Sequence, residues 1–144
     1  MRAAAVHEAL ARVNFERDVA MLTERVAARL NLVVHSRDYP ILDVTVQHTR
    51  PVRLRFQGDS FDELPPLVTI LHLDGTAHRG PFPPGGVFNA GPHSKHGGPF
   101  VCMRGSRDYH THHLEDAWSN YRGQDGMGIV GIFMQLASVW RKGT

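Results

Sequence analysis

Val52-Arg53-Leu54-Arg55-Phe56-Gln57 alternates apolar and polar side chains residue by residue. A period of two is typical of a β-strand with one buried face and one exposed face. Three further short apolar segments, at residues 32–35, 41–46 and 67–73, lie on either side of it and are separated by turn residues. Four successive strands with short turns and no intervening helix favour an antiparallel meander. We therefore expect a four-stranded antiparallel sheet.

Apolar residues at steps of three or four precede and follow the predicted sheet, which indicates one amphipathic helix on each side. The apolar positions of the first are Phe15, Val19, Leu22, Val26 and Leu30. Those of the second are Ile129, Ile132, Phe133, Leu136 and Trp140. We expect the first helix to run unbroken to Asn31 and to pack on the sheet. The second should be buried, with its two glycines permitting close packing. The predicted fold class is α+β.

Length and composition limit the classes of protein to consider. With 144 residues and 16.1 kDa, the chain fits a single domain over residues 1–144. The 16 basic and 14 acidic residues leave a formal net charge of only +2, which argues against a dedicated nucleic-acid binder. No apolar run has the length of a signal-peptide core or a membrane span. We expect a soluble, cytoplasmic protein without a nucleic-acid or membrane partner.

Residues 74–98 are dense in glycine and proline, and we expect no regular element there. A loop of this length inside a compact domain is usually functional or disordered. It leads into an apolar patch at residues 99–103 that would anchor Cys102 against the core. A single cysteine excludes an intramolecular disulfide and any Cys-x-x-Cys motif. The question of function therefore centres on Cys102.

Histidines gather on both sides of Cys102, at His93, His96, His110, His112 and His113. One interpretation is a nucleophilic thiolate, whose pKa Arg104, Arg107 and the nearby histidines would lower. The other is a zinc site. On an extended segment, His110 and His112 would share one face, and Cys102, His113 or Glu115 would complete a tetrahedral set. A cysteine protease ranks third, because the local signatures of the known families are absent.

The order of these features resembles the ubiquitin-conjugating enzymes. Residues 61–68 are similar to the family's Tyr-Pro-x-x-Pro-Pro-x-Val segment and keep Pro65, Pro66 and Val68. The segment Pro92-His93-Ser94-Lys95 followed by 98–103 is similar in spacing to the family's His-Pro-Asn and Gly-x-Ile-Cys-Leu, and Trp118-Ser119 to its Trp-Ser-Pro. Ser94 and Lys95 replace the family's Pro and Asn. The variant looks like the bacterial conjugating enzymes of Bil-type antiphage operons.

The resemblance implies an α+β fold like that of the ubiquitin-conjugating enzymes, with the glycine-, proline- and histidine-rich loop at its active site. It also implies a cysteine acyl transferase. Cys102 would accept a ubiquitin-like protein as a thioester from its activating enzyme and pass it to a lysine or another amine of a protein substrate. Such chemistry needs no cofactor. The zinc site with Cys102, His110, His112 and His113, and a non-catalytic scaffold of the same fold, stay open as alternatives.

Site residues follow from the same resemblance. His93 would stabilise the oxyanion, and Asp108, His110 or His112 would steer or deprotonate the incoming amine. The residues expected to contact the activating enzyme lie on the first helix and are Arg12, Glu16 and Arg17.

Overall fold

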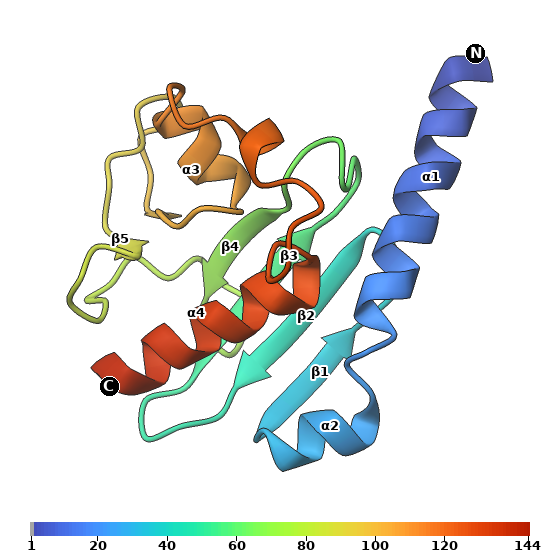
Figure 1. Cartoon of the computed structure of the whole chain (residues 1–144). Helices are drawn as coiled ribbons and strands as arrows, with labels where there is room; N and C mark the ends of the chain where they lie inside the picture. Colours follow the sequence, from blue (N-terminus) through green and yellow to red (C-terminus); the bar gives the residue numbers. More distant parts are fainter. Residues whose placement is uncertain (1) are drawn as a thin grey trace.

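The computed structural model describes residues 2–144, with side chains from residue 7 onward (Figure 1). Its first helices and strands are α1 (Arg2–Val19), α2 (Glu24–Arg29), β1 (Leu32–Ser36), β2 (Ile41–Val46), β3 (Val52–Gln57) and β4 (Leu67–Leu71). They are followed by β5 (Phe88–Asn89), β6 (Phe100–Val101), α3 (Arg107–His112), a 3-10 turn (Trp118–Asn120) and α4 (Ile129–Gly143). The fold is α+β, with an N-terminal helix, a four-stranded antiparallel sheet and a C-terminal helix.

The strands β1 to β4 follow one another in the sheet in chain order, each antiparallel to the next. Leu54 of β3 lies between Val44 of β2 and Ile70 of β4. The alternation that predicted the strand thus places every second residue in the core. The buried side chains of this inner face are Leu42, Val44, Val46, Val52, Leu54, Phe56, Val68 and Ile70.

Helix α4 crosses the inner face of the sheet (Figure 1). Phe133 meets Phe56 of β3 edge-on, with ring centroids 5.9 Å apart. At the start of the helix, the carboxylate of Asp18 in α1 accepts the backbone N–H of Ile129, which joins the two helices. A Cβ added to Gly128 would lie 2.7 Å from that carboxylate. The expected close packing at this glycine is therefore confirmed.

The prediction of one unbroken helix before the sheet is wrong. Helix α1 ends at Val19, and the side chain of Thr23 caps a separate helix, α2, by accepting the Val26 N–H at 3.2 Å. The turn between them lets α2 pack beside β1. Asn31, in the left-handed region at φ 54°, ends the helical segment as expected. None of the helices within residues 2–144 is long and apolar enough to cross a membrane.

The prediction that residues 74–98 form no regular element is also wrong in part. Phe88 pairs with Val101 and Asn89 with Phe100, so the loop contributes β5 to a two-stranded antiparallel ribbon with β6. Earlier in the loop, the His78 N–H donates to the Ile70 carbonyl at 3.0 Å. The loop is therefore tied both to β4 and to the strand that precedes Cys102.

His78 fixes this loop against α4. Its buried ring stacks on His72 with centroids 4.2 Å apart and meets Trp140 edge-on at 6.0 Å. Its Nδ1 accepts the Gly80 N–H at 3.0 Å. Burial, and to a smaller extent the neighbouring His72 and Arg50, lowers the pKa of His78 below its ordinary value of 6.5. The folded protein therefore binds a proton on this imidazole less readily than the unfolded chain does.

We predict that His78 makes the fold sensitive to acid. Between the lowered pKa and about 6.5, the unfolded chain binds more protons than the native protein, so stability falls as pH drops through that window. Free energies of unfolding from urea titrations at about pH 7.5 and about pH 5.5 measure the difference. His78→Phe should shrink it, whereas His48→Gln, at an exposed turn, should leave it unchanged. An equal difference in wild type and His78→Phe would contradict this role.

Candidate active site

Cys102 lies directly after β6, at a half-buried position. Its backbone N–H donates to the Val87 carbonyl at 2.7 Å, which continues the ribbon formed by β5 and β6. The two residues before it, Phe100 and Val101, are buried in the core. The apolar patch therefore anchors the cysteine as the sequence predicts, and its thiol stands at the point where the chain leaves the strand.

Ser106 joins this strand to helix α3. Its fully buried hydroxyl lies 2.8 Å from the Val101 carbonyl and 2.9 Å from the Met103 carbonyl, and donates its hydrogen to these acceptors. The same oxygen accepts the Tyr109 N–H at 3.3 Å and so caps the first turn of the helix. One side chain thus fixes where α3 begins relative to Cys102.

Helix α3 brings a histidine to the thiol. The Sγ of Cys102 lies 3.5 Å from Nε2 of His113, the residue that follows the last turn of α3. The His113 ring packs on Tyr109 with centroids 4.7 Å apart, and its Nδ1 lies 3.6 Å from the Glu115 carboxylate. The arrangement is a thiol beside an imidazole that can take its proton, which is the basic unit of nucleophilic cysteine chemistry.

The thiol itself is not acidified by its surroundings, contrary to the sequence-based prediction. Burial raises the pKa of Cys102. Arg104 binds the Asp116 carboxylate at 3.0 Å, and Arg107 binds that of Asp59 at 3.2 Å, so both expected cations are paired elsewhere. A largely protonated thiol needs a base to become a nucleophile, and His113 is placed for that role.

His110 and His112 do not share a face, because residues 107–112 form a helix and not the expected extended segment. Two residues apart on a helix, side chains point in nearly opposite directions. Inside the protein, His110 accepts the Gly105 N–H through Nε2 at 3.0 Å and donates through Nδ1 to the Asp116 carbonyl at 2.7 Å. His112 accepts the Ser94 N–H at 3.2 Å. Within the described residues, the proposed zinc ligands do not form a group around Cys102, although His113 lies beside its thiol.

Asp116 anchors the segment that follows α3. Its carboxylate accepts the hydroxyls of Tyr109 at 2.5 Å and Tyr121 at 2.7 Å, as well as the Arg104 guanidinium. These hydrogen bonds lower the pKa of Asp116 to about 2, and the bond from Tyr109 has the largest effect. Its role is to hold Tyr109, and hence the ring on which His113 packs.

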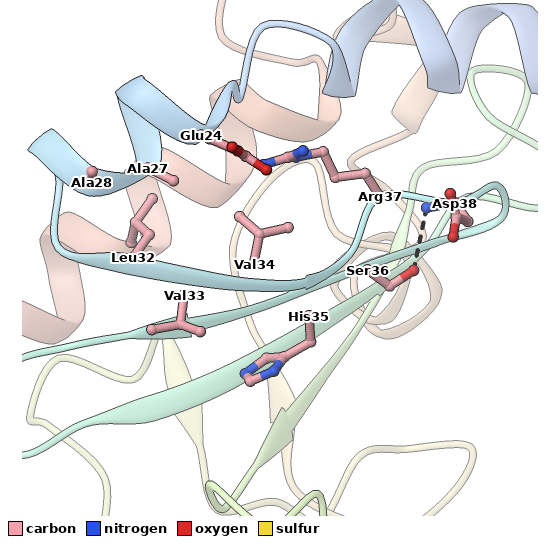
Figure 2. Close-up of a pocket in the computed structure, with 10 residues that line it drawn as sticks. All are labelled: Glu24, Ala27, Ala28, Leu32, Val33, Val34, His35, Ser36, Arg37 and Asp38. Carbon is pink, nitrogen blue, oxygen red and sulfur yellow. Dashed lines mark hydrogen bonds between the residues drawn. The ribbon is translucent and has the colours of Figure 1, made fainter.

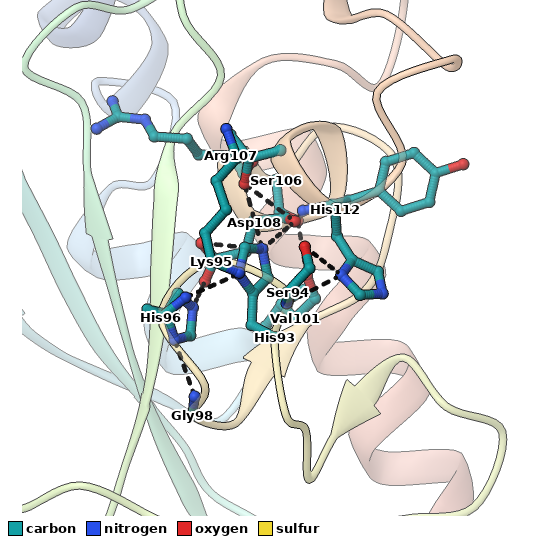
Figure 3. Close-up of polar contacts among 12 residues, drawn as sticks. His93, Ser94, Lys95, His96, Gly98, Val101, Ser106, Arg107, Asp108 and His112 are labelled. Carbon is teal, nitrogen blue, oxygen red and sulfur yellow. Dashed lines mark hydrogen bonds and ion pairs between the residues drawn. The ribbon is translucent and has the colours of Figure 1, made fainter.

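A second polar cluster ties the loop to α3 (Figure 3). His93 is 2% exposed and donates from Nε2 to the Asp108 carbonyl at 2.9 Å. His96 contacts the Asp108 carboxylate from Nε2 at 3.2 Å. On their other nitrogens, His93 accepts the Lys95 N–H at 3.1 Å and His96 the Gly98 N–H at 3.1 Å. His93 and Asp108, both expected near the chemistry, thus form the junction between loop and helix.

The composition of this cluster, two histidines and an aspartate, is that of a metal site, and its ligand atoms lie within 4.8 Å of one another. Its geometry is not. The lone pair of an imidazole nitrogen lies in the ring plane, but these rings stack 4.2 Å apart at an interplanar angle of 4°. In two rings stacked in this way, the in-plane lone pairs cannot both point at one metal ion. Because each Nδ1 accepts an N–H, each Nε2 carries the proton that a metal would replace. The cluster is held by hydrogen bonds, and we call the contacts of His93 and His96 with Asp108 the clasp, since they join the loop to α3.

The residues expected to bind an activating enzyme lie on the exposed surface of α1. Arg12 sits over the Tyr39 ring at 4.7 Å and within 3.6 Å of the Glu16 carboxylate. Arg17 donates to the Asn14 side chain at 3.1 Å. The partner of this surface stays a prediction.

A pocket of about 440 Å³ lies far along the chain from Cys102, between α2 and β1 (Figure 2). Its lining residues are Glu24, Ala27, Ala28, Leu32, Val33, Val34, His35, Ser36, Arg37 and Asp38. It contains no residue of the thiol site, so the two are separate features of the surface.

Comparisons with known proteins add no assignment to this geometry. No protein-family model matches the chain, and no curated protein is similar to it.

The sequence names His113 only as an alternative metal ligand and does not predict its contact with the thiol. A signal for it exists: Ser106 followed three residues later by Tyr109 in a polar segment is compatible with an N-cap, and a helix of two turns from there ends beside residue 113.

We predict that Ser106→Ala destabilises the protein by about 1–2 kcal/mol, because it removes the cap of α3 and the buried hydrogen bond to Val101. Urea denaturation measures the loss, and hydrogen exchange at the Tyr109 amide should rise. Ser138→Ala, on the exposed side of α4, should change stability by less than about 0.5 kcal/mol. Equal effects of the two substitutions would show that Ser106 does not join strand and helix.

Proposed function

We propose that this protein carries an acyl group as a thioester on Cys102 and transfers it to an amine, in the manner of the ubiquitin-conjugating enzymes that it resembles. The acyl donor in this proposal is a ubiquitin-like protein held by its activating enzyme, and the acceptor is a lysine or another amine of a protein substrate. The setting proposed is the bacterial cytoplasm, in an antiphage operon.

The single observation that carries the proposal is the contact of 3.5 Å between the Cys102 thiol and the His113 imidazole. A thiol is the side chain best suited to accept an acyl group and release it again, because a thioester stays reactive towards amines. The order of helix, meander, loop, cysteine and C-terminal helix supports the same class of enzyme.

Loading of Cys102 requires one proton transfer. As Sγ attacks the carbonyl of the donor thioester, Nε2 of His113 takes the thiol proton, and the departing thiolate of the activating enzyme then receives a proton. Negative charge collects on the carbonyl oxygen, which needs hydrogen-bond donors. In the described part of the chain, the backbone N–H groups of Met103 and Arg104 have no protein acceptor. We assign them this role in place of His93, whose ring nitrogens are engaged in the clasp.

Transfer to an amine uses the same base. The incoming amine attacks the thioester, an amide bond forms, the bond to Sγ breaks, and His113 passes the amine's proton to the thiolate. His110 and His112, expected from the sequence to act here, are bound to the Gly105 and Ser94 amides. General-base catalysis by a positioned histidine contributes about 10²–10⁴ in rate.

The test is a loading assay with the ubiquitin-like protein and activating enzyme of the same operon, and ATP. We predict an adduct that is visible on a non-reducing gel and removed by excess thiol, and that Cys102→Ala does not form. His113→Gln should lower the initial loading rate by about 10²-fold or more. His48→Gln is the matched control, because it removes an exposed imidazole in the β2–β3 turn.

Three results would contradict the proposal. An adduct that Cys102→Ala still forms would place the acyl group on another side chain. Absence of any adduct together with stoichiometric zinc would favour the metal-binding alternative. Absence of both, with stable binding of the ubiquitin-like protein, would favour a scaffold.

A further inference from the structure

We infer that this protein also hydrolyses the acyl thioester on Cys102, with His113 as the general base for water, and that it therefore acts as a thioesterase and esterase on small activated acyl groups. The inference shares the thiol of the proposed function and extends its chemistry. It needs no ubiquitin-like partner, so it can be tested separately.

The first argument is the position of the base after acylation. Nε2 of His113 lies 3.5 Å from Sγ in the free enzyme, so it stands beside the carbonyl carbon once Sγ carries an acyl group. A base at that place removes a proton from whichever nucleophile reaches the thioester. Water and an amine must both lose a proton when they attack the thioester, and the imidazole can accept it from either.

The second argument is access. The His113 side chain is 38% exposed, and Cys102 is half-buried and not enclosed. Bulk water therefore reaches the imidazole directly. The Glu115 carboxylate faces Nδ1 at 3.6 Å, which favours the proton on Nδ1 and leaves Nε2 as the acceptor. Because Glu115 is 79% exposed, solvent screens this charge, and we assign it no catalytic role.

The third argument is the ground state of the thiol. Its environment favours the protonated form, so the acyl-enzyme forms only with a base to assist, and the same base is then present for the next step. Arg104 and Arg107 are paired with Asp116 and Asp59, so neither is free to stabilise the thiolate.

The reaction has two balanced steps. First, Sγ attacks the ester carbonyl, the bond to the leaving alcohol breaks, and the thiol proton passes through His113 to that alcohol. Second, His113 takes a proton from water, the resulting hydroxide attacks the thioester, the bond to Sγ breaks, and the thiolate recovers the proton. The net change is one ester and one water converted to one acid and one alcohol. No oxidant, reductant or metal is required.

The probe is p-nitrophenyl acetate with the purified chain. Wild type should release p-nitrophenol continuously, and Cys102→Ala should release none above the buffer rate. His113→Gln should lower the steady rate by about 10²-fold or more, while His48→Gln keeps the wild-type rate. Thermal melting of each variant checks that it folds.

Intact-protein mass spectrometry separates acylation from hydrolysis. Wild type is acetylated with a stoichiometric pulse of the ester, and His113→Gln is acetylated to the same extent with excess ester. The acetyl mass should then disappear from wild type and persist in His113→Gln. An acetyl mass that decays equally slowly in both proteins would overturn the inference. If a ubiquitin-like protein loads onto Cys102 but the acetyl-enzyme is stable, the proposed function stands and the inferred hydrolysis is wrong. If the ester is turned over but no ubiquitin-like protein is loaded, the hydrolysis stands and the proposed function is wrong.

Discussion

The rest of the site depends on the hydrogen bonds made by the hydroxyl of Ser106. It binds the carbonyl of Val101, one residue before the thiol, and it caps α3, the helix that ends beside His113. A nucleophile and a base that lie eleven residues apart in the chain are thereby placed 3.5 Å from each other. Because Ser106 is fully buried, neither water nor a nearby side chain can readily replace it.

Two further attachments hold this unit on the sheet. The clasp of His93 and His96 on Asp108 joins α3 to the loop, and Asp116 joins the segment after α3 to Tyr109 of that helix. The clasp also shows that composition alone does not define a metal site. Histidine and aspartate gather there, but stacked rings and engaged Nδ1 atoms assign them to structure.

The sheet and α4 follow from the sequence, because period-two and helical spacing report directly which side chains are buried. The helix before the sheet was harder to predict. Apolar spacing continues across residues 20–23, so only the capping geometry of Thr23 reveals the break. The pairing of Phe88 with Val101 is a long-range contact between very short segments, which no local pattern carries. The uniqueness and position of Cys102 make it the candidate nucleophile, whereas the contact of His113 with it depends on the length and orientation of α3.

Activation of Cys102 by His113 would show most clearly in the rate at which iodoacetamide alkylates the thiol. Cys102 is the sole cysteine, so the reading is free of competing thiols. We expect that near neutral pH His113→Gln slows alkylation of the folded protein by at least about tenfold, because a thiol whose pKa is raised by burial loses its base. Equal alkylation rates in wild type and His113→Gln across the neutral range would contradict it.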